Sequence, residues 1–185
     1  MMKNIIIKKD EEKILPVVWT GGEEHIDYKI LLSQPGASII LLMLFLGKKQ
    51  HAGLVNVSVI HDSPQTKSKV LVKGILEDSA SIDFNGLVKI QEKAKGSQAW
   101  LGAHLLLLSE SAKGRAVPSL EILENDVKAG HATTVGRIND NQVFYLMSRG
   151  LSKKQARKLI IEGFVQQFLA EFPEEERKKA RRELM

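Results

Sequence analysis

The chain has 185 residues, no cysteine, and 27 Lys plus Arg against 22 Asp plus Glu, a formal net charge of +5 at pH 7. That length favours one domain that buries its own core, and the missing cysteine excludes disulfides, thiolate nucleophiles and cysteine-ligated metal or iron–sulfur sites built from this sequence alone. Aromatic residues make up only 5%, and the basic residues of the last third alternate with acids, so we expect no nucleic-acid partner.

Targeting signals are not expected in this sequence. The apolar stretch Ile5–Ile7 is too short for the core of a signal peptide. The longest apolar run, Ile39–Leu46, is far shorter than a bilayer span, and we predict it to be a strand buried on both faces. With no cysteine and no export signal, we expect a cytoplasmic protein without a membrane partner.

Residues 1 to about 138 show the pattern of successive short strands. Apolar Val55, Val57 and Val59 alternate with polar residues, which is the period of a half-buried strand. No convincing helix interrupts the series, so the pattern favours an all-β core. It does not separate a sandwich from a parallel β-helix, because the turn signal Asn85-Gly86 could close a hairpin or turn a corner of a coil. Further predicted strands are Ile5–Ile7, Ile14–Trp19, Ile26–Leu32, Ile82–Phe84, Leu105–Leu108, Leu120–Leu123 and Thr133–Ile138.

Residues 139–185 show helical patterns instead. Asn139 with Gln142, and Ser152 with Gln155, are spaced as capping boxes that open two helices, and Gly150 suits the end of the first. Pro173 suits the start of a third helix, whose acids precede its bases. The sequence therefore predicts a β-helical or other β core over 1–138 and a C-terminal helical segment over 139–185.

Motifs for common chemistries are missing. The sequence has no phosphate-binding loop, no dinucleotide-binding glycine motif, no H-E-x-x-H and no G-x-S-x-G, so ATP hydrolysis and serine catalysis by this chain are not expected. His51 and His61 lie at opposite ends of one β segment, and His131 follows several acids at a predicted turn. His131 is either a hydrogen-bonded turn residue or a ligand for a soft metal.

Several segments carry a resemblance to a known family: His61–Ser68, Lys73–Ile75, Phe84–Ile90, Leu105–Ser109, Leu120–Ile122, His131–Thr133, Val143–Leu151 and Gly163–Phe164. Their order and spacing together resemble the SufB/SufD family of iron–sulfur cluster assembly scaffolds. Residues 1–60 match only loosely, as additional coils. The resemblance implies a right-handed parallel β-helix followed by a C-terminal helical segment, and it favours the β-helix over the sandwich.

The family resemblance also implies a function. It suggests a non-catalytic scaffold subunit that pairs with a SufB/SufD-like subunit, as a homo- or heterodimer, and docks a SufC-like ABC ATPase that supplies hydrolysis. His131 matches a histidine implicated in cluster assembly and becomes the candidate cluster and metal ligand. The segment with Phe144, Tyr145, Arg149 and Gly150 matches the ATPase-docking region, although Phe144 and Tyr145 have an alternative interpretation as core residues.

The absence of cysteine makes the chain look SufD-like or like a shortened paralogue. Any iron–sulfur cluster would then be transient and shared, with thiolates supplied by a partner or a small thiol. One alternative is a partner that regulates or stabilises the complex without touching iron. Another is a metal-dependent β-helix enzyme that uses some of His51, His61 and His131.

Overall fold

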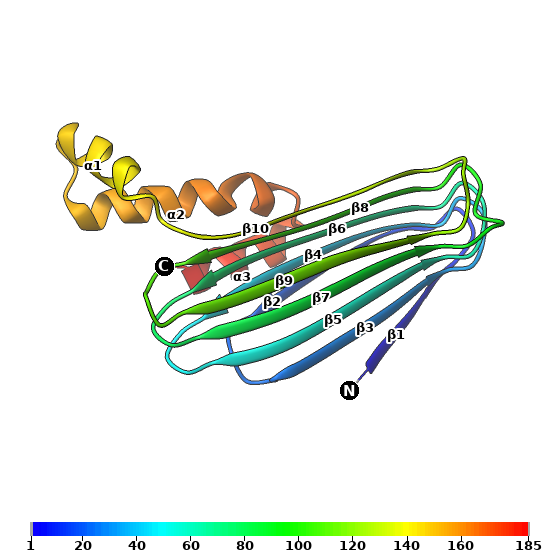
Figure 1. Cartoon of the computed structure of the whole chain (residues 1–185), viewed down its shortest axis with the longest axis horizontal. Helices are drawn as coiled ribbons and strands as arrows, with labels where there is room; N and C mark the ends of the chain where they lie inside the picture. Colours follow the sequence, from blue (N-terminus) through cyan, green and yellow to red (C-terminus); the bar gives the residue numbers. More distant parts are fainter. Residues whose placement is uncertain (1, 185) are drawn as a thin grey trace.

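The computed structural model describes residues 2–184 as ten strands followed by three helices (Figure 1). Successive strands alternate between two five-stranded parallel sheets, so the chain winds as a parallel β-solenoid. The elements are β1 (Met2–Ile7), β2 (Glu12–Trp19), β3 (His25–Leu32), β4 (Ser38–Gly47), β5 (Ala52–His61), β6 (Lys67–Leu76), β7 (Ser81–Ile90), β8 (Gln98–Leu107), β9 (Lys113–Ile122), β10 (Lys128–Arg137), α1 (Asp140–Ser148), α2 (Lys153–Ala170) and α3 (Glu174–Leu184).

The two sheets, called sheet A and sheet B below, hold the odd and the even strands. Sheet A has the order β1-β3-β5-β7-β9, and sheet B has the order β10-β8-β6-β4-β2. Figure 1 shows the sheets stacked face to face along the length of the strands. Parallel pairing throughout confirms the predicted β-helix and rules out the antiparallel sandwich.

Coils of unequal length explain why no exact repeat is visible in the sequence. Asn56 follows its partner Asp27 after 29 residues, whereas Arg115 follows its partner Asp83 after 32. The extra residues lie in the turns, because each strand from β4 to β10 keeps ten residues. The strands therefore pair in the same way in every coil, although the number of residues per coil varies.

The interior of the solenoid is filled by every second residue of each strand, stacked on its partner in the next coil. Val55, Val57 and Val59 of β5 are all buried, as their alternation predicts. The Asn85-Gly86 turn prediction is wrong, because both residues lie inside β7. Asn85 faces outward and bonds to Asn56, while Gly86 faces inward, where a Cβ would lie 2.9 Å from Leu101 Cδ2.

Strand β4 is buried on both faces, as its apolar run predicts. Its inward residues join the solenoid core, and its outward residues Leu42, Leu44 and Leu46 pack under the helices. The helical partners are Val165, Phe168, Leu169, Phe172 and Ala180 of α2, α3 and their connection. Burial of these side chains, at about 25 cal/mol per Å² of apolar surface, holds the tail on sheet B.

Three polar contacts spaced seven residues apart reinforce that packing along α2. The Arg157 guanidinium donates to the Leu108 carbonyl at 2.7 Å, and the Glu171 carboxylate pairs with Lys69 at 2.5 Å. Between them the Phe164 carbonyl accepts from Lys73. Seven residues are about two helical turns, so these contacts lie on one face of the helix.

The strand-to-helix change falls between Arg137 and Asp140. The Asn139 side chain caps α1 through the amide of Asn141 rather than through a reciprocal pair with Gln142. Ser152 and Gln155 form the predicted capping box of α2. The division into domains 1–138 and 139–185 stays a prediction. Within residues 2–184, none of the helices combines the length and apolar character that crossing a membrane requires.

Candidate functional site

His131 lies in the middle of β10, at the open C-terminal end of the solenoid. The turn placement expected from the sequence is wrong, because β10 runs unbroken from Lys128 to Arg137. His131 pairs in register with Leu101, which faces the interior, so the imidazole lies on the inner side of the last coil. No further coil covers it, and its side chain is exposed.

The strand edges beside His131 are unpaired. Within residues 2–184, β9 pairs only with β7 and β10 pairs only with β8, so each leaves one edge of backbone donors and acceptors open. Pro118 interrupts the donors of β9, since proline has no N–H, and such residues are typical of edge strands. β10 contains no proline and carries the β-favouring run Thr133–Val135, so its edge can accept another strand.

The donor atoms available here decide what this chain can do for a metal cluster. The sequence has no cysteine, so its side chains offer imidazole nitrogens and carboxylate oxygens. Among residues 2–184, no group of three or more His, Asp or Glu side chains converges as a metal site would require. His131 can therefore supply one ligand, and a complete site would need ligands from outside residues 2–184.

His61 serves the core rather than a metal. It takes the place of an aliphatic residue in the inward stack between Leu32 and Ile90, where its side chain has no solvent exposure. Its ring nitrogens lie 2.8 Å from Thr66 Oγ1 and 2.7 Å from Ser68 Oγ. Burial lowers the pKa of His61 to about 4, so the imidazole is neutral at pH 7.

The other candidate histidines do not converge on His61. His51 precedes β5 and packs edge-on against Trp19 with ring centroids 5.9 Å apart, whereas His61 ends the same strand. Ten extended residues separate the two by roughly 30 Å. His51 and His61 therefore share no site, and no group of three or more His, Asp or Glu side chains within residues 2–184 joins either of them to His131.

The residues predicted to dock an ATPase lie on α1 and directly after it. α1 projects beyond the ends of the sheets (Figure 1). Phe144 is 73% exposed and Tyr145 is 57% exposed, so their alternative interpretation as core residues is wrong. Val143 is the buried residue of α1 and packs with Ile138 and Ala156, and the partly buried Leu146 packs against the same cluster. Two further apolar side chains of the tail, Met147 and Leu159, are also exposed.

Arg149 and Gly150 shape this surface. The Arg149 guanidinium lies 5.3 Å from the centroid of the Tyr145 ring and donates to its hydroxyl at 3.4 Å. Gly150 has a φ of 93°, a left-handed conformation that favours glycine, and its amide and that of Leu151 bond back to the last turn of α1. α2 then turns back along α1, leaving between the helices a depression of about 500 Å³ lined by Asn141, Gln142, Tyr145, Leu146 and Ile160.

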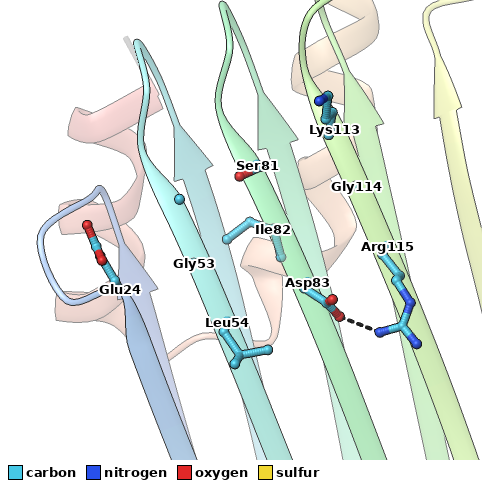
Figure 2. Close-up of a pocket in the computed structure, with 10 residues that line it drawn as sticks. Glu24, Gly53, Leu54, Ser81, Ile82, Asp83, Lys113, Gly114 and Arg115 are labelled. Carbon is cyan, nitrogen blue, oxygen red and sulfur yellow. Dashed lines mark hydrogen bonds and ion pairs between the residues drawn. The ribbon is translucent and has the colours of Figure 1, made fainter.

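A second depression, of about 450 Å³, lies on the outer face of sheet A (Figure 2). Figure 2 shows Asp83 of β7 and Arg115 of β9 pointing toward each other, with Arg115 2.7 Å from the carboxylate. Arg115 also donates to Asn85 at 3.0 Å. The charges of Asp83 and Arg115 neutralise each other within the sheet, and the other charged residues of the lining are Glu24 and Lys113.

The fold and these surfaces define a β-solenoid with an open edge strand and a projecting helical tail. Residues 12–164 match the family described as SUF system FeS cluster assembly, SufBD core domain. The chain belongs to this family, whose members take part in iron–sulfur cluster assembly. The match begins at residue 12, so it includes most of residues 1–60, which carry little of the resemblance visible in the sequence.

Curated relatives include SufD and SufB. SufD of Bacillus subtilis is 40% identical over 134 residues, which cover 72% of this chain and 31% of the relative. SufB of the same organism is 30% identical over 146 residues, covering 79% of this chain and 31% of the relative. A SufBD family protein of Mycobacterium tuberculosis is 31% identical over 160 residues, which cover 86% of this chain and 18% of the relative. The chain thus spans a third or less of the length of these relatives.

Proposed function

We propose that this chain is a non-catalytic scaffold subunit of an iron–sulfur cluster assembly complex and that it docks a SufC-like ABC ATPase through α1. The observation that carries the proposal is the exposure of Phe144 and Tyr145 on a projecting helix of a SUF family member. Large exposed aromatic side chains are typical of protein interfaces. The partner supplies ATP hydrolysis, because this sequence has no phosphate-binding loop.

The second part of the proposal is pairing with a SufB/SufD-like subunit, as a homo- or heterodimer, through the open edge of β10. Support comes from the unpaired backbone of that strand, since an exposed edge favours strand addition. His131 lies on this strand and would donate one ligand to a transient cluster at the interface. The cluster is cargo rather than a resident cofactor. A cytoplasmic location, and the lack of nucleic-acid and membrane partners, stay predictions.

The ATPase contact is tested by co-purification of the full chain with a SufC-like ABC ATPase. The double variant F144A/Y145A should lose most of the bound ATPase, because it removes the two largest exposed side chains of α1. A matched control is Ile14→Ala on β2, an exposed apolar residue at the other end of the solenoid. Equal recovery of the ATPase by the double variant and the control would disprove docking through α1.

The ligand role of His131 needs a separate readout. In the assembled complex, His131→Ala should lower the amount of cluster formed, measured by visible absorbance, while ATPase binding is unchanged. His25→Ala, another exposed strand histidine, is the control. Unchanged cluster formation in the His131 variant would instead support the alternative of a regulatory or stabilising partner that does not touch iron.

A further inference from the structure

The outer face of sheet B holds a groove of about 540 Å³ where the helical tail does not cover the strands. Outward residues from the first halves of β2, β4, β6, β8 and β10 line it. This volume lies within the range of small-molecule sites in proteins. The residues that matter for its chemistry are Glu12, Lys67, Lys69, Gln98, Trp100 and Lys128.

Trp100 forms an aromatic platform in this groove. A Cβ on Gly130 would lie 2.9 Å from Trp100 Cζ3, and one on Gly102 would lie 3.2 Å from Trp100 Nε1, so the indole rests against the backbone at two glycines. The side chain is nevertheless 44% exposed. Its N–H has no hydrogen-bond partner among residues 2–184, whereas the buried Trp19 donates to the Glu23 carbonyl. An open indole surface of this kind stacks planar rings.

Two lysines flank the platform. Lys67, Gln98 and Lys128 are register partners on three adjacent strands, and Gln98 precedes Trp100 by two residues on β8. Their row therefore lies about 7 Å from Trp100 along the strands. Neither Lys67 nor Lys128 forms an ion pair within the described part of the chain. Lys69, by contrast, is bound by Glu171 of the tail.

The acids of the surroundings limit the length of a ligand. Glu12 lies two strands from Lys67 in the same row, and Glu171 lies on the side of the tail. A long polyanion would meet one of these carboxylates, whereas a single anionic group between Lys67 and Lys128 meets neither. The corresponding cation on sheet A, Arg115, is already neutralised by Asp83.

We propose that this groove binds a small planar aromatic molecule that carries a phosphate, of the size of a mononucleotide. Its ring stacks on Trp100, and its phosphate lies between Lys67 and Lys128. The step from the platform to the lysine row is comparable with the separation of base and phosphate in a mononucleotide. This site is distinct from His131 and from α1, and it does not rest on the proposed scaffold function.

The probe is AMP, with adenosine and inorganic phosphate as its separate halves. The full chain carrying Trp19→Phe keeps Trp100 as its only tryptophan, so quenching of emission reports on the groove alone. We expect saturable quenching by AMP, with adenosine and phosphate each at least about tenfold weaker, because each makes only part of the contact. Added salt should weaken AMP binding, because two exposed lysines hold the phosphate.

Matched variants decide the assignment by calorimetry with AMP. K67Q/K128Q should weaken binding about tenfold, and Trp100→Leu should abolish it. K29Q/K113Q, which removes two exposed lysines from sheet A, should bind like the unsubstituted chain. The proposal is overturned if about 10 mM AMP does not bind, if adenosine binds as well as AMP, or if K67Q/K128Q retains full affinity. Binding of a single-stranded oligonucleotide where AMP fails would assign the groove to a polymer and also overturn it.

Discussion

Lys73 of β6 donates a hydrogen bond to the carbonyl of Phe164 in α2, and its ammonium lies 4.3 Å from the centroid of the Phe164 ring. Burial lowers the pKa of Lys73. Its neighbour in the register, His104, also has a lowered pKa, first because of burial and then because of the Lys73 charge. The helical tail is therefore held on sheet B by the partly desolvated ammonium of Lys73 as well as by apolar contacts.

Replacing Lys73 should loosen the tail without unfolding the solenoid. Lys73→Met keeps the length of the side chain but loses the bond to the Phe164 carbonyl and the cation–π contact, at a cost of about 1–2 kcal/mol. Hydrogen exchange in α2 should become faster. Lys89→Met on sheet A, which breaks only a solvent-accessible pair with Glu121, is the control. Equal protection of α2 in both variants would contradict this role.

His61 should make stability depend on pH. Its pKa is about 4 in the folded chain against 6.5 when unfolded, so the unfolded state binds the proton more readily between these values. Stability should fall as pH drops from 6.5 to 4, by up to about 3 kcal/mol from this group. In urea unfolding measured at several pH values, His61→Leu should remove this part of the pH dependence of the free energy of unfolding. The exposed control His25→Gln should keep it. An unchanged slope for His61→Leu would refute this assignment.

Gly86 should be intolerant of a side chain. An added Cβ would lie 2.9 Å from Leu101 Cδ2 and 3.0 Å from the Phe84 ring, so Gly86→Ala forces the packed core to shift at about 1–3 kcal/mol. Gly136→Ala on β10 is the matched control, since nothing lies within 4 Å of its added Cβ. Urea unfolding of both variants measures the difference. Equal midpoints would show that the core adapts freely.

The side chains of Asn56 and Asn85 form a hydrogen-bonded row with Asp27 on the outer face of sheet A, and this row should set the pKa of Asp27. The Asn56 side chain donates to Asp27 at 2.8 Å, and this bond is the main cause of the lowered pKa of Asp27. Asn56→Leu should therefore raise that pKa toward 3.8, as measured by NMR titration of the carboxyl carbon. Asn85→Leu, one coil further along, leaves the bond to Asp27 in place and should change the pKa less.

Local patterns predicted much of this fold. The alternation of Val55, Val57 and Val59 reports which face of β5 is buried, and Ser152 with Gln155 reports where α2 begins, because both signals depend on neighbours close in sequence. Exposure of Phe144 could not be predicted in this way. An apolar residue on a short amphipathic helix is indistinguishable from a core residue until the position of that helix is known.

Pairing between coils escaped prediction for a physical reason. Asn85-Gly86 has the composition of a tight turn. In the structure, Asn85 is held extended by its bond to the Asn56 amide, and the ring of Phe84 leaves room only for glycine at position 86. The Asn56 contact depends on strand register and the Phe84 contact depends on core packing. The sequence predicts a turn at His131, between two short strands and after several acids. The ring of Trp100, one coil earlier, instead occupies the space beside Gly130.

The seven-residue spacing of Arg157, Phe164 and Glu171 has a mechanical consequence. Sliding α2 by one turn, about 5.4 Å, would separate the Arg157 guanidinium from the Leu108 carbonyl and the Glu171 carboxylate from Lys69 at the same time. α2 therefore has one favourable position on sheet B, and a shift by one turn does not give a second. A force applied to α1 is therefore transmitted along α2 to sheet B. α2 either stays bound and moves the solenoid with it, or it detaches as a whole.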